Sequence, residues 1–196
     1  MAMQNVRALV VGEYGVGKTT LLITFTENIF PWNYISRWEN TSIGFEAKGI
    51  LFNLALWETY SSGDDYARFR RLSYPETDVL IVCFSTSDRT SFGKVKWWVE
   101  EVRPYCPDAK VFVVLTKLDL RDDPATIEQM KELGETLISE EEGRELAKEI
   151  GAEKYMECSS IQNVNLRELF EEVCCSVGVF PTTAVPKKKK KECQIM

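Results

Sequence analysis

The sequence predicts an α/β fold, with a six-stranded, mostly parallel sheet that carries helices on both faces. Short apolar runs rich in β-branched residues recur along the chain, and segments with a helical pattern separate most of them. Strands that alternate with helices are typical of a parallel sheet, because each crossover helix packs back onto the sheet. The composition, 44% hydrophobic and 28% charged, is close to the globular average and supports one ordered core.

Six segments have the length and composition of strands. Gly49 separates two of them, and we expect the first of that pair to be antiparallel. Ser139 and Glu142 form a capping box that begins a helix continuing to about Ile150. The predicted strands are residues 5–11, 43–48, 50–57, 78–84, 110–115 and 153–158. The predicted helices are 17–27, 88–103, 139–150 and 165–177, and residues 30–42 are predicted to form a loop.

The length of 196 residues suits one domain, which we place at residues 1–178, followed by a flexible tail at 179–196. The chain has no His, which excludes His triads, His-ligated zinc and imidazole bases. Its six Cys lack metal-ligand spacing, so we expect reduced thiols in a cytoplasmic protein. No apolar run approaches the roughly 20 residues that cross a bilayer, and the N-terminus lacks the pattern of a secretory signal.

Charge is unevenly distributed along the chain. The net charge is −6, yet the last ten residues hold five Lys and one Glu. The body is therefore more acidic than the whole, which argues against binding to nucleic acid. The basic tail instead favours an anionic membrane surface. We expect a monomer.

A glycine-rich motif follows the first predicted strand and precedes the first predicted helix. Residues 12–19 match the pattern G-x-x-x-x-G-K-[ST] of a phosphate-binding loop. Its glycines turn successive N–H groups toward an anion, Lys18 adds a full positive charge, and the Thr19 hydroxyl suits Mg²⁺. The alternative is a Gly-rich turn with a surface Lys. The predicted phosphate-binding residues are Gly12, Tyr14, Gly15, Val16, Gly17, Lys18 and Thr19.

Two later motifs indicate guanine as the base. Asp119, after the strand 110–115, can accept hydrogen bonds from both N1–H and the exocyclic amino group of guanine, a donor pair that adenine lacks. The stem of Lys117 can lie along the purine, and the Ser159–Ser160 segment after the last strand can offer N–H groups to O6. All three motifs follow strand ends, where ligands bind in open α/β sheets.

Together these motifs resemble the small GTPases of the Ras superfamily, specifically the Rho branch with its Rac-like members, over almost the whole chain. The resemblance implies a P-loop NTPase fold, GTP or GDP with Mg²⁺, and Phe30 packed edge-on against guanine. It also implies that residues 123–138 are the Rho insert helix. The stretches that carry it are residues 30–31, 72–78, 83–85 and 116–123. The guanine-binding residues that it implies are Thr20, Phe30, Lys117, Asp119, Leu120, Ser159 and Ser160.

The phosphate loop and the first switch region depart from this family. Tyr14 replaces a glycine, and its phenol should crowd the γ-phosphate and the attacking water. Residues 34–37 read Tyr-Ile-Ser-Arg where the family has Tyr-Ile-Pro-Thr. Arg37 cannot bind a cation because it has only donors, and Ser36 or Thr41 could replace the missing Thr only if the loop shifts. Arg37 is either a solvated side chain or a cation that stabilises phosphate charge.

The second switch region departs as well. Glu58 replaces the family's Asp and can still reach Mg²⁺ through water, so Thr19 and Glu58 are the predicted metal site. The Gln that orients the attacking water is absent, and Ser62 or Asp64 falls at its position. Ser is too short to bridge water and phosphate, and Asp would bring a negative charge near the γ-phosphate, so neither replaces the longer, neutral amide. No catalytic residue is therefore assigned.

These observations predict a guanine-nucleotide-binding switch with very slow or absent GTP hydrolysis. The resemblance implies Rho-type regulators and cytoskeletal effectors as partners. One alternative is a scaffold that holds nucleotide permanently, or barely at all, and acts only through interactions. Another alternative is a P-loop kinase. Asp119 argues against it, and so does the prenylation motif of the last four residues, 193–196.

The last four residues, beginning at Cys193, form a C-a-a-X box that predicts prenylation. One lipid chain alone gives marginal membrane binding, so a second signal is needed. Lys187 to Lys191 supply it, at about 1 kcal/mol per Lys near an anionic leaflet. We therefore expect the protein at the inner face of the plasma membrane or at an internal membrane.

Overall fold

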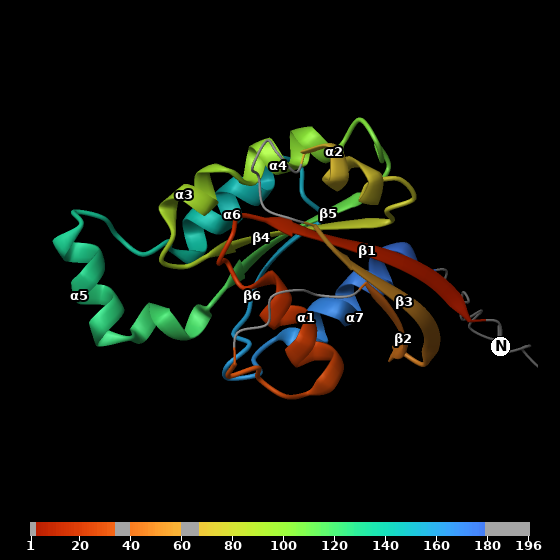
Figure 1. Ribbon diagram of the computed structural model, residues 1–196, viewed down its shortest axis with the longest axis horizontal. Helices are drawn as coiled ribbons and strands as arrows, with labels where there is room; N and C mark the ends of the chain where they lie inside the picture. Colours follow the sequence, from red (N-terminus) through yellow and green to blue (C-terminus); the bar gives the residue numbers. More distant parts are fainter. Residues whose placement is uncertain (1–2, 34–39, 60–66, 179–196) are drawn as a thin grey trace, which may run out of the picture.

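The computed structural model describes residues 3–33, 40–59 and 67–178. Its six-stranded sheet has the order β2-β3-β1-β4-β5-β6 (Figure 1). β2 pairs antiparallel with β3, and every other neighbouring pair is parallel. The predicted fold class and the antiparallel strand are both confirmed. The strands are β1 Gln4–Gly12, β2 Thr41–Ala47, β3 Ile50–Glu58, β4 Val79–Ser85, β5 Lys110–Thr116 and β6 Lys154–Glu157.

The helices cover both faces of this sheet (Figure 1). Alternate residues of β1 separate into two cores: Val6, Ala8 and Val10 pack with α1 and α7, whereas Leu9 and Val11 pack with α4 and α6. Because successive side chains of a strand point to opposite faces, both cores are apolar and β1 is buried on each side. The helices are α1 Lys18–Glu27, α2 Ala67–Arg70, α3 Arg89–Gly93, α4 Val95–Val102, α5 Pro124–Glu132, α6 Glu140–Glu149 and α7 Leu166–Val177.

The structure differs from the sequence prediction at one long helix, at one polar stretch and at two boundaries. β2 begins at Thr41, inside the predicted loop 30–42, and α5 ends at Glu132, before the end of the predicted insert helix 123–138. The predicted helix 88–103 is broken at Lys94 into α3 and α4. The polar stretch before β4 contains α2 and a short 3₁₀ helix, Arg71–Ser73. Because α2 spans only one turn, it is too short to show an apolar periodicity in the sequence. The break at Lys94 leaves no such signal either.

Other local predictions agree with the structure. The capping box of Ser139 and Glu142 is present at the start of α6. α5 lies within the segment 123–138 and stands at the side of the domain (Figure 1). Among the described residues, none of the helices combines the length and the apolar character that a membrane crossing needs.

We predict that Phe170→Ala in α7 will lower the free energy of unfolding by about 3–5 kcal/mol, because it empties a core site. The Phe170 side chain is fully buried, and its ring stacks on Phe25 with centroids 3.9 Å apart. The control is Leu133→Ala, whose side chain is 65% exposed and should change stability by less than about 0.5 kcal/mol. Urea denaturation measures both, and equal effects would contradict this account of the core.

Candidate functional site

The predicted motifs meet at one edge of the sheet. β1, β3, β5 and β6 run in the same direction, so their carboxyl ends lie together (Figure 1). The glycine-rich loop follows β1, Glu58 ends β3, Lys117 follows β5 and Cys158 follows β6. The carboxyl edge is where open α/β sheets bind ligands.

The glycine-rich loop depends on backbone conformations that only glycine adopts easily. Gly12 has φ +142°, and a Cβ atom there would lie 2.3 Å from the carbonyl oxygen of Cys83. Gly17 has φ +99° and is the N-cap of α1. The close approach to β4 and the left-handed cap aim the amino end of α1 at the loop, as an anion-binding nest requires.

Lys18 is buried, with only 6% of its surface exposed. Its ammonium group donates to the carbonyl oxygens of Gly12 at 2.9 Å and Glu13 at 2.8 Å. Burial lowers the pKa of Lys18, and the nearby Glu58 carboxylate opposes that shift. A buried cation whose desolvation is only partly offset favours an anionic ligand, so the residues present fit a phosphate group.

Thr19 and Glu58 form the second polar cluster. The Thr19 hydroxyl lies 2.8 and 2.9 Å from the two Glu58 carboxylate oxygens and donates to them. Burial raises the pKa of Glu58, whereas Lys18 and the Thr19 hydrogen bond lower it. Because the Thr19 hydroxyl donates its hydrogen bond to a carboxylate, the lone pairs of its oxygen stay available for a cation. The donor set of hydroxyl and carboxylate oxygens therefore fits Mg²⁺.

The loops after β5 and β6 are joined beside this cluster. The Ser159 hydroxyl donates to the Asp119 carboxylate at 2.5 Å, and the Leu118 N–H donates to the Cys158 carbonyl at 3.1 Å. The Lys117 stem borders the phosphate loop, since its Cε lies 3.9 Å from a Cβ atom built at Gly17. The structure thus brings Lys117 next to the phosphate-binding motif and joins Asp119 to Ser159.

The remaining predicted residues fall into two groups, those that the structure describes and those outside the described residues. Thr20, Leu120 and Ser160 are half-buried, and the half-buried Phe30 makes an edge contact with Trp32, with ring centroids 4.9 Å apart. Tyr14 is 74% exposed. Thr41 begins β2 and pairs with Leu56. The predictions for Ser36, Arg37, Ser62, Asp64, Lys187–Lys191 and Cys193 lie outside the described residues.

Sequence reasoning assigned no role to two residues that support the loop. The Thr116 hydroxyl, at the end of β5, lies within hydrogen-bond distance of the carbonyl oxygens of Val16 and Phe84. The position of Thr116 in the motif Thr-Lys-Leu-Asp is the sequence feature that could have indicated this role. The Trp98 indole N–H donates to the Glu13 carboxylate at 3.2 Å, and no sequence pattern links residues so far apart.

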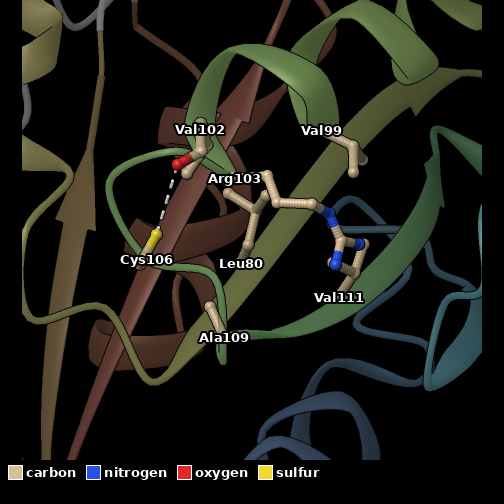
Figure 2. Close-up of a pocket in the computed structure, with 7 residues that line it drawn as sticks. All are labelled: Leu80, Val99, Val102, Arg103, Cys106, Ala109 and Val111. Carbon is tan, nitrogen blue, oxygen red and sulfur yellow. Dashed lines mark hydrogen bonds between the residues drawn. The ribbon is translucent and has the colours of Figure 1, made fainter.

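A small apolar pocket beneath the end of α4 lies away from this edge (Figure 2). Leu80 and Val111 line it, and both are near the amino ends of their strands. Cys106 also lines it, and burial raises the pKa of its thiol. This pocket does not contribute to the nucleotide site.

We predict that Glu58→Gln will raise the Mg²⁺ concentration needed for slow nucleotide release by about tenfold, because the charge behind the metal-binding hydroxyl is lost. Fluorescent GDP release at graded Mg²⁺ concentrations measures this. The control, Glu132→Gln on an exposed position of α5, should behave as the unaltered protein. An unchanged Mg²⁺ dependence in Glu58→Gln would contradict the proposed metal site.

Comparison with protein-family models agrees with this geometry. The model of the Ras family matches residues 7–178, which include the phosphate loop, Glu58, Asp119 and Ser159. The match includes β1 from Arg7 onward, all of the other five strands and nearly the whole described part of the chain. The chain belongs to the Ras family of small GTPases.

Proposed function

We propose that this Ras-family protein is a Rho-type signalling switch at membranes whose GTP hydrolysis is very slow or absent. Family membership makes it a GTP-binding small GTPase that uses GTP, GDP and Mg²⁺. One contrast carries the proposal: the groups that bind nucleotide are assembled at one edge of the sheet, whereas the residues that drive hydrolysis in the family are missing from the sequence.

Nucleotide binding would use residues that already contact one another in the structure. The loop 12–19 and Lys18 would hold the phosphates, and Thr19 would hold Mg²⁺ with Glu58 acting through water. Asp119, positioned by Ser159, would select guanine, flanked by Thr20, Phe30, Lys117, Leu120 and Ser160. The metal neutralises phosphate charge when bound.

We expect slow hydrolysis because different residues stand at the positions of the family's catalytic groups. Ser62 is too short to bridge water and phosphate, and Asp64 would place a negative charge near the γ-phosphate. Without a Thr at position 37, the first switch loses its main attachment to both the metal and the γ-phosphate. The exposed Tyr14 side chain is available to occupy the space that an inserted arginine from an activating protein would need.

The Rho assignment and the partners rest on sequence stretches and on one structural feature. α5 stands where the Rho insert helix is expected, between β5 and α6. Rho-type regulators and cytoskeletal effectors are accordingly the proposed partners. The altered switch residues should weaken binding to partners that require the usual switch sequences.

We predict that single-turnover GTP hydrolysis will be far slower than in a small GTPase with an intact Gln and switch Thr. Restoring both groups, with Arg37→Thr and Ser62→Gln, should raise the rate by at least tenfold, because each supplies a contact to the reacting phosphate. The control is Arg103→Thr, a substitution outside the site at the end of α4. Hydrolysis by the unaltered protein at an ordinary rate would exclude the proposal.

The proposed location depends on the C-terminal motif. We predict that Cys193→Ser will move the protein from the membrane to the soluble fraction of cells, because five Lys alone bind anionic lipid only weakly and reversibly. Cys175→Ser is the control, since that thiol lies on α7 within the domain. Unchanged fractionation of Cys193→Ser would refute the lipid anchor.

A further inference from the structure

We propose that Trp98 is a positioning residue for the nucleotide. Its indole N–H donates a hydrogen bond to the Glu13 carboxylate and thereby fixes the phosphate loop from the α4 face of the sheet. This inference rests on the proposed nucleotide binding and adds a residue outside the set predicted to bind the nucleotide. Trp98 lies on α4, and Glu13 lies in the loop between β1 and α1. The two residues are 85 positions apart in the chain.

The first observation is the burial of the Trp98 indole. The Trp98 side chain is completely buried, and its Nε1 atom lies 3.2 Å from the Glu13 carboxylate. A buried indole N–H needs a hydrogen-bond partner, because leaving it unpaired costs the full desolvation of the group. Here the acceptor is a side chain of the phosphate loop. The contact therefore ties the loop to the core on the α4 face of the sheet.

The second observation is that Glu13 is held at both ends. Its carboxylate accepts from Trp98, and its main-chain carbonyl accepts from the buried Lys18 ammonium at 2.8 Å. The Glu13 backbone begins the turn that presents the loop N–H groups. Fixing its side chain limits the conformations of the loop before a ligand binds, which reduces the ordering cost of binding an anion.

The third observation is that Trp98 is itself held in place. The Arg70 guanidinium lies 5.5 Å from the centre of the Trp98 ring and forms an ion pair with Glu101 at 3.1 Å. Arg70 is 1% exposed, and the Tyr74 hydroxyl donates to the same Glu101 carboxylate. A cation on the ring face and a buried ion pair restrict the indole to one orientation. α2, the segment that follows the second switch region, is thereby connected to the phosphate loop.

The test compares substitutions that keep or remove this hydrogen bond. Trp98→Phe keeps a ring beneath Arg70 and removes the donor, whereas Glu13→Ala removes the acceptor. Each should speed the release of fluorescent GDP at saturating Mg²⁺ by about tenfold, the size expected for one hydrogen bond to a charged group. Glu13→Gln keeps an acceptor oxygen and should give a rate between those of the unaltered protein and Glu13→Ala.

Three further measurements separate positioning from general loss of structure. Trp97→Phe is the matched control, because the Trp97 ring lies 5.7 Å from the same guanidinium, and its release rate should stay unchanged. The double variant Trp98→Phe with Glu13→Ala should release GDP no faster than the faster single variant, because both remove one bond. Nucleotide-free urea denaturation reports any separate effect on folding.

Each outcome has a defined meaning. The inference is overturned if Trp98→Phe releases GDP at the rate of Trp97→Phe, or if the effects in the double variant multiply. Should Trp98→Phe fail to fold, equal release by Glu13→Gln and Glu13→Ala would overturn the inference, and slower release by Glu13→Gln would support it. If the unaltered protein binds neither GDP nor GTP, the proposed function fails first and this inference fails with it.

Discussion

A buried ammonium group at the start of α1 is the constraint on which the site depends. Lys18 is removed from water, and its hydrogen bonds go to the carbonyl oxygens of Gly12 and Glu13. Burial without a full counter-charge raises the energy of the charged form, as the lowered pKa of Lys18 indicates. The loop therefore holds a site that an anion stabilises, and the nearby Glu58 carboxylate partly offsets the desolvation of Lys18.

Hydrogen bonds between loops keep this site in place. Thr116 joins β5 to the phosphate loop, Ser159 joins the loop after β6 to Asp119, and Trp98 joins α4 to Glu13. Each bond connects segments far apart in the sequence. Because the strands that carry these segments are parallel, their loops emerge at the same edge, and a few side chains are enough to set the distances between binding groups.

The proposed separation of binding from hydrolysis has a physical basis. The proposed nucleotide contacts use backbone N–H groups, one Lys and one Asp, which the sheet and α1 position. Hydrolysis in this family depends on side chains of the two switch regions rather than on the sheet and α1. Under the proposed function, the residues present at Arg37 and Ser62 would slow the chemistry without changing the groups proposed to hold the nucleotide.

The sequence by itself determined the sheet, its antiparallel strand, the phosphate loop and the family, because short apolar runs and the Gly12–Thr19 motif are local patterns. It did not reveal the break at Lys94, the one-turn helix α2 or the contact between Trp98 and Glu13. Those features depend on which side chains meet after the sheet has formed. Periodicity records the face on which a residue lies, and only packing in three dimensions decides which distant residue it contacts.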